Sequence, residues 1–127
     1  AIAGVEVATS ILDGEALPAV EIQPKEGIYD FAARYTAGTV EFHVPARLDH
    51  EVTERVRAAA VAAYEAVGAR HVSRCDLIVD EHGTPFILEL DTCPGMTETS
   101  LLPLAAQAAG LDFGDLCERL VTLALPS

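Results

Sequence analysis

The stretch HVSRCDLIVDEHGTPFILELD, residues 71–91, has the pattern of a β-hairpin. Two apolar segments, 71–79 and 85–91, flank the polar sequence DEHGT, which carries the glycine and short polar side chains that turns favour. We therefore predict two antiparallel strands joined by a turn over residues 80–84.

The predicted hairpin gathers charged side chains on one face of a sheet. With residues 82–83 as a two-residue loop, Asp76 lies opposite Glu89 and Arg74 lies opposite Asp91. Directly opposed residues share a face, and successive residues alternate between faces, so these four side chains belong to the same face. The other face is predicted to be the core and receives Cys75, Leu77, Val79, Leu88 and Leu90.

Three neighbouring carboxylates need a counter-charge. Each close pair repels by about 4 kcal/mol at an effective dielectric constant of about 20, and one arginine cannot neutralise three acids. A hard divalent cation can, because Mg²⁺ and Mn²⁺ take carboxylate oxygens as ligands. We therefore interpret Asp76, Glu89 and Asp91 as a metal site. The alternative is a solvated sheet face that binds nothing.

The segment after the hairpin adds groups that suit anions. The turn at Pro94-Gly95 exposes backbone N–H groups beside the acids, and Thr97, Thr99 and Ser100 begin a predicted helix. Helix N-termini bind anions, so the combination favours a reaction on phosphate and carboxylate groups. The hydroxyls are also typical of an ordinary N-cap, and one residue can serve both roles.

The remaining sequence predicts a mixed α and β architecture, and a chain of 127 residues favours one domain. The predicted elements are strands at 4–12 and 16–22 joined by a turn at 13–14, a functional loop at 23–40, a helix at 49–67 capped by Asp49, and two helices after residue 101 that separate near 110–112.

The charge balance argues against two classes of partner. The chain has 8 Lys and Arg against 20 Asp and Glu, a formal net charge of −12, so nucleic acid and anionic membranes are poor partners. No apolar run reaches the roughly 18 residues of a membrane span. Three cysteines without C-x-x-C spacing favour the reducing cytoplasm. For the charge alone, a generally acidic surface is a better explanation than metal binding.

Several motifs together resemble one family. GVEVATSIL, YDFAARY, SRCD and LELDTCPGMTETSLLP, with the pairs Leu17-Pro18 and Pro45-Ala46, are similar to the C-terminal part of D-alanine–D-alanine ligases of the ATP-grasp superfamily. The resemblance implies an α+β fold, the ATP-grasp C-terminal subdomain, with a mainly antiparallel sheet packed by helices. It identifies residues 1–127 as a partial ATP-grasp domain, the C-terminal portion of a longer ligase.

The resemblance also implies a reaction. ATP phosphorylates the carboxylate of one D-alanine, the amine of a second D-alanine attacks the acyl phosphate, and the dipeptide enters peptidoglycan precursors. The implied cofactors are ATP and two Mg²⁺ ions, with Mn²⁺ as a substitute. Further expected partners are the N-terminal and central regions of the same enzyme and a second copy in a homodimer.

Site residues follow from the resemblance by motif. They comprise metal ligands, groups that stabilise the reacting oxyanion, groups that hold the second D-alanine, a ribose ligand and an active-site loop. The implied metal ligands are Asp76, Glu89 and Asp91, and the implied oxyanion donors are Arg74 and the Gly95 amide. Ser100 and the Leu101 amide are implied to hold the second D-alanine, and Glu6 the ribose. The active-site loop carries Arg34, which contacts phosphate or carboxylate, and Tyr35, which orients substrate.

Three positions depart from the family pattern. Arg34 stands where lysine is usual, Asp91 where asparagine is usual, and Ser73 where glycine is frequent. Arginine and lysine are not interchangeable at an anion site. These departures allow an amino-acid ligase of a secondary-metabolite pathway. The chain also lacks a Gly-rich phosphate loop, so we expect the isolated fragment to be inactive. A non-catalytic remnant module and an ATP-grasp enzyme for another carboxylate are the remaining alternatives.

Overall fold

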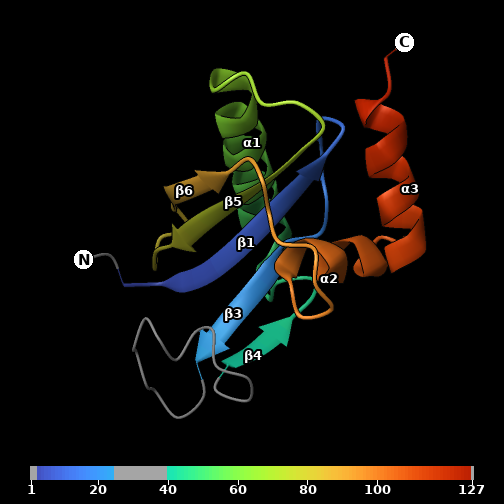
Figure 1. The fold of residues 1–127 in the computed structure, drawn as a ribbon. Coiled ribbons are helices and arrows are strands. Elements are labelled where there is room, and N and C mark those ends of the chain that lie inside the picture. The colour runs from blue at the N-terminus through green and yellow to red at the C-terminus, as the bar shows by residue number, and fades with distance from the viewer. Residues whose placement is uncertain (1–2, 25–39, 127) are drawn as a thin grey trace.

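The computed structural model describes residues 3–24 and 40–126, which fold into an antiparallel sheet with helices on both faces (Figure 1). The α+β class predicted from the sequence is confirmed. Within these residues the sheet has six strands in the order β4-β3-β1-β5-β6, with β2 paired to β1. The strands are β1 (Val5–Leu12), β2 (Glu15–Ala16), β3 (Val20–Pro24), β4 (Val40–His43), β5 (Val72–Val79) and β6 (Pro85–Asp91).

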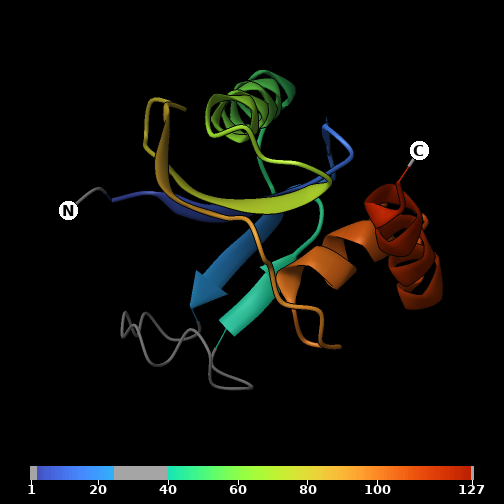
Figure 2. The ribbon, with the colours of Figure 1, turned by 45° about the horizontal axis from the view of Figure 1, so that its top comes forward.

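The described residues also form three helices, as predicted: α1 (His50–Ala66), α2 (Leu101–Ala108) and α3 (Phe113–Ala124). Helix α1 covers one face of the sheet, and α2 and α3 lie on the other side (Figure 2). Asp49 caps α1 by accepting from the Val52 amide at 2.8 Å, and Asp112 forms a capping box with Asp115 in α3. None of these helices combines the length and apolar character needed to cross a bilayer.

The main core lies between α1 and the sheet. Leu77 of β5 and Val7 of β1 are fully buried there against Val56 and Ala60 of α1. Burying a side chain of this size stabilises the fold by about 1.5–3 kcal/mol. A second apolar cluster joins the other face to α2 and α3 through Leu12, Leu102, Ala106 and Leu116.

Proline interrupts one predicted strand. The segment 16–22 is not continuous: β2 ends at Ala16 and β3 begins at Val20, because Pro18 has no N–H to contribute to a ladder. Strand β4 pairs with β3 and was not indicated by the sequence pattern. Residues 25–39 of the predicted functional loop lie outside the described residues.

The hairpin formed by β5 and β6 has the predicted residue pairs near Asp76, but its loop and its ladder differ from the regular hairpin that was assumed. The predicted turn over residues 80–84 is confirmed, because the ladder closes at Val79 and Pro85, and the Asp80 side chain accepts from two amides of this turn. The two-residue loop assumed for the register is wrong. A β-bulge then adds one unpaired residue, Leu88, to β6. Leu88 is 50% exposed, so its predicted place in the core is also wrong.

Candidate active site

The bulge restores the register that the acidic face requires. Asp76 lies between Ala8 of β1 and Glu89 of β6, and Arg74 lies opposite Asp91. Since opposed residues share a face, the structure brings Arg74, Asp76, Glu89 and Asp91 to the same face, as the sequence predicted. This face is opposite the one that α1 covers.

Arg74 is the centre of this charged group. Its Nε donates to Oδ1 of Asp76 at 2.9 Å and its Nη2 donates to Oδ2 at 3.1 Å, a two-point contact. The same Nη2 lies 3.9 Å from Oδ2 of Asp91. The side chains are 17% exposed for Arg74, 12% for Asp76 and 31% for Asp91, so the pair of Arg74 and Asp76 is largely shielded from water.

Glu89 lies across the ladder from Asp76 but is exposed. In the described ranges, the side chains do not form a ready cluster of three or more His, Cys, Asp or Glu residues arranged to hold a metal ion. What the structure shows is the shared face and the paired positions. The donor type fits Mg²⁺ or Mn²⁺, because all three acids supply carboxylate oxygens.

Glu6 belongs to the same face. It lies on β1 two residues before Ala8, and Ala8 pairs with Asp76, so the alternation of the strand directs both to one side. Glu6 pairs with Ile22 of β3 and Ile78 of β5 and is 8% exposed. Three adjacent strands therefore contribute acidic residues to this face.

The chain turns directly from the acids into a compact polar loop. Oδ1 of Asp91 accepts from the Cys93 amide at 2.8 Å and so fixes the exit from β6. Further along, Oγ of Ser100 accepts from the Thr97 amide at 3.0 Å and lies 2.8 Å from Oγ1 of Thr97. This contact holds the loop closed just before α2 begins.

Gly95 lies close to Ser100 in the same loop. A Cβ built at Gly95 would lie 2.8 Å from Oγ of Ser100, closer than side chains pack, so any larger residue must displace the serine. Ser100 stands at the N-cap position of α2 but makes no side-chain capping bond. The Leu101 amide, one of the first N–H groups of the helix, has no acceptor within the helix and is a candidate donor to an anion, together with the Ser100 hydroxyl if that hydroxyl exchanges its contact with Thr97.

The sequence interpretation of Cys75 as a core residue is confirmed. Cys75 is fully buried, and burial, with a smaller contribution from the neighbouring Asp76, raises the pKa of its thiol to about 11. It stays protonated at neutral pH and is not a nucleophile. Arg34 and Tyr35 lie outside the described residues, so their roles stay predictions.

One polar contact, between Arg47 and Glu21, was not predicted from the sequence. Arg47 donates to the Glu21 carboxylate through its backbone amide at 3.0 Å, its Nε at 3.1 Å and its Nη2 at 2.8 Å. Hydrogen bonds from Arg47 hold the pKa of Glu21 below its usual value. The contact ties the segment after β4 to β3. The only signal in the sequence was a single glutamate in an apolar strand, with no indication of its partner.

Comparisons with known proteins identify the family of this chain. The family model described as "D-ala D-ala ligase C-terminus" matches residues 1–122. A D-alanine–D-alanine ligase of Anaeromyxobacter sp. (strain Fw109-5) is 51% identical over 118 residues, which are 93% of this chain and 38% of that protein. The ligase of Methylacidiphilum infernorum is 45% identical over 122 residues, or 96% of this chain and 40% of that protein.

Solved structures give the same result. The D-alanine–D-alanine ligase from Bacillus anthracis complexed with ATP superposes with a TM-score of 0.83 at 35% identity, over 97% of this chain and 40% of that one. VanG D-Ala:D-Ser ligase from Enterococcus faecalis gives 0.79 at 30% identity, over 98% of this chain and 37% of that one. The chain thus spans about two-fifths of the length of these relatives. It belongs to the D-alanine–D-alanine ligase family and corresponds to its C-terminal part.

Proposed function

We propose that this chain is the part of an ATP-dependent D-alanine–D-alanine ligase that binds metal, nucleotide phosphates and the second D-alanine, for peptidoglycan precursor synthesis. In this proposal residues 1–127 are one portion of an ATP-grasp domain that the N-terminal and central regions of the same enzyme complete. The observation that carries it is the cross-strand register of Arg74, Asp76, Glu89 and Asp91, followed at once by the Gly95–Ser100 loop.

The three acids are assigned to the cation. Asp76, Glu89 and Asp91 would hold Mg²⁺, two ions in the proposed holoenzyme, with Mn²⁺ as a substitute of the same ligand preference. When bound, these ions offset the negative charge of the ATP phosphates. Both oxygens of Asp76 accept hydrogen bonds from Arg74, so a cation at Asp76 must share that carboxylate with the guanidinium or displace it.

The other groups act on substrate. Arg74 and the Gly95 amide donate toward the oxyanion of the tetrahedral intermediate, where a preorganised donor has its largest effect. Ser100 and the Leu101 amide hold the carboxylate of the second D-alanine. Glu6 is assigned to the nucleotide ribose, because it lies buried on the same face. Arg34 and Tyr35 are assigned to the loop that covers phosphate and substrate.

We also propose a cellular location and an oligomeric state. An enzyme that consumes ATP and has free thiols at Cys75, Cys93 and Cys117 fits the cytoplasm. We also propose a homodimer, which light scattering of the full-length enzyme measures directly.

The activity is tested on the full-length enzyme. ADP release in the presence of Mg²⁺ should depend on D-alanine, and mass spectrometry should identify D-alanyl-D-alanine. D-serine, D-lactate and L-amino acids serve as comparison substrates. Turnover with one of these in place of D-alanine would support the secondary-metabolite alternative, and ATP binding without any amino-acid-dependent turnover would support a non-catalytic module.

Glu89→Gln tests the metal assignment by itself. Isothermal titration with Mg²⁺ and a non-hydrolysable ATP analogue should show weaker metal-dependent nucleotide binding in this variant. Glu81→Gln is the matched control, because Glu81 is an 86% exposed acid in the turn of the same hairpin. Equal binding by wild type, Glu89→Gln and Glu81→Gln removes Glu89 from the site.

A further inference from the structure

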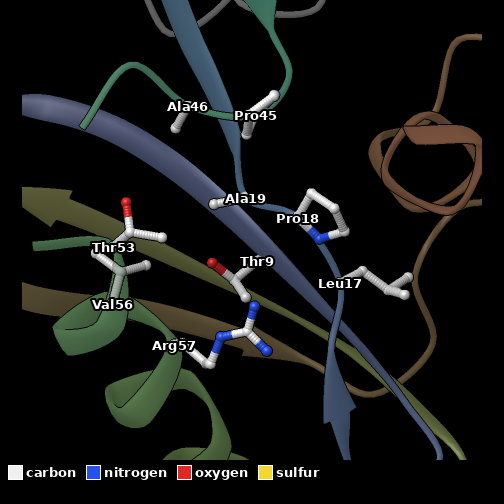
Figure 3. A pocket seen from close by; sticks show the side chains of 9 residues that line it. All are labelled: Thr9, Leu17, Pro18, Ala19, Pro45, Ala46, Thr53, Val56 and Arg57. Atoms are coloured by element: carbon white, nitrogen blue, oxygen red, sulfur yellow. The ribbon is translucent and has the colours of Figure 1, made fainter. Parts of the chain in front are cut away.

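A cavity of about 220 Å³ lies on the α1 side of the sheet, and Figure 3 shows the residues that line it. It opens between β1, the segment that joins β2 to β3, the segment after β4, and helix α1. Its wall is mainly apolar and includes Leu17, Pro18, Pro45 and Val56. A 150 Å³ cavity in another protein holds benzene, so this volume admits a compact molecule of about seven heavy atoms.

The floor of the cavity carries a buried hydroxyl. Thr9 lies on β1 between Val7 and Ile11, opposite Cys75 of β5, and is 1% exposed. Its Oγ1 has no hydrogen-bond partner in the described part of the chain. The hydroxyls of Ser10 and Ser73 are also buried without a partner there, but neither residue lines the cavity. A valine would fit an apolar site without the desolvation cost of a hydroxyl, so the oxygen at Thr9 is informative.

A cation completes the polar side. Arg57 extends from α1 toward Thr9 (Figure 3) and is half exposed. Its Nη1 lies 3.4 Å from the Ala16 carbonyl oxygen, and its Nε lies 3.8 Å from Oε1 of Glu54. Both contacts are long, and no contact in the described residues involves Nη2. The guanidinium therefore keeps capacity for a further acceptor.

We propose that this cavity binds a small monocarboxylic acid. The apolar body of the acid fills the space beside the two prolines and Val56, and its carboxylate accepts from Arg57 and from the Thr9 hydroxyl. The site is separate from the proposed active site, because Thr9 belongs to the α1 face of β1, whereas Glu6, three residues earlier on the same strand, belongs to the opposite, acidic face.

Isovalerate is the probe, because it has seven heavy atoms, and isovaleramide is its neutral isostere. Binding to the full-length enzyme is followed by ligand-observed NMR at constant ionic strength. We expect saturable binding in the low millimolar range, as few ligand atoms allow, with isovalerate binding at least about fivefold more tightly than isovaleramide. No saturation, or equal affinity for acid and amide, overturns the proposal.

Variants locate the site. Arg57→Gln should weaken the binding of isovalerate about fivefold or more and leave the binding of isovaleramide unchanged. The expected factor is modest, because an ion pair with a half-exposed arginine contributes less binding free energy than one with a buried arginine. Arg55→Gln is the matched control, because Arg55 is on the same helix, is paired with Glu51 and does not line the cavity. Thr9→Ser should retain binding and Thr9→Val should weaken it, with thermal melts confirming folding. Isovalerate binding that is unaffected by Arg57→Gln places the acid elsewhere, including at Ser100, and refutes the assignment.

Discussion

Asp91→Asn separates two roles that the structure gives to one side chain. Asp91 carries a negative charge beside Arg74, and its Oδ1 accepts from the Cys93 amide at 2.8 Å. Asparagine has the same shape and keeps an Oδ1 acceptor, so the exit from β6 stays in place. Only the charge is removed, and activity should be retained.

The size of the effect follows from Coulomb's law. A unit charge about 4 Å from a divalent cation contributes about 2 kcal/mol in bulk water and more where the site is shielded. Asp91 is 31% exposed and its Oδ2 lies 3.9 Å from Nη2 of Arg74, so the positive charge of the guanidinium offsets part of the attraction between Asp91 and the cation. A net loss of about 0.7–1.4 kcal/mol remains, which raises the Mg²⁺ concentration for half-maximal rate by about three- to tenfold.

The assay is a Mg²⁺ titration of the rate of the full-length enzyme at saturating ATP, together with thermal melts in chelator. The metal-free variant should melt slightly higher, because one of three neighbouring negative charges is gone. Asp91→Ala should shift the Mg²⁺ midpoint further than Asp91→Asn, because it also removes the oxygen ligand, and it should raise the KM for the second D-alanine, since it loses the bond to Cys93. Glu81→Gln controls for net charge. A Mg²⁺ midpoint that does not move in Asp91→Asn refutes the reasoning.

Ser100→Ala should raise the KM for the second D-alanine by a factor equivalent to about 1.5–3 kcal/mol and change the KM for ATP little; equal effects on both would leave Ser100 a structural role only. Gly95→Ala should raise the same KM, because its Cβ meets Oγ of Ser100 at 2.8 Å, and an unchanged KM would contradict that crowding. Glu21→Gln tests pH dependence by denaturant unfolding. Since Arg47 lowers the folded-state pKa of Glu21, wild type should lose stability relative to the variant as pH falls below about 4.5. A difference that is constant from pH 7 to 3 would be the contrary result.

The sequence predicted what regular alternation determines. The alternation of β5 and β6 placed Asp76 opposite Glu89, and a cap at Asp49 with a stop at Gly68 bounded α1. The bulge could not be predicted, because a two-residue loop on a regular ladder and a turn over residues 80–84 with a bulge in β6 produce the same pairs at Asp76 and Arg74. For this reason Leu88 was predicted to lie in the core, whereas it is the unpaired and exposed residue of the bulge.

Contacts between distant segments were the other limit. Nothing local marks Arg47 as the partner of Glu21, which is 26 residues away, and the approach of Gly95 to Ser100 depends on how the loop folds back. The candidate site residues were predicted from residue type and motif, since charged groups in a strand stand out against apolar neighbours. Their distances required the fold.

The bulge has a consequence for comparing relatives. If one residue is deleted from β6 before Glu89, the ladder becomes regular, and Asp76 still faces Glu89 while Arg74 still faces Asp91. A one-residue gap at 85–88 in an alignment therefore leaves the acidic side chains of the hairpin on the same face of the sheet. A gap in β5 between Asp76 and Val79 is not, because no spare residue there absorbs it and the following side chains exchange faces. Length variation among homologues should accordingly be confined to the β6 arm and the turn.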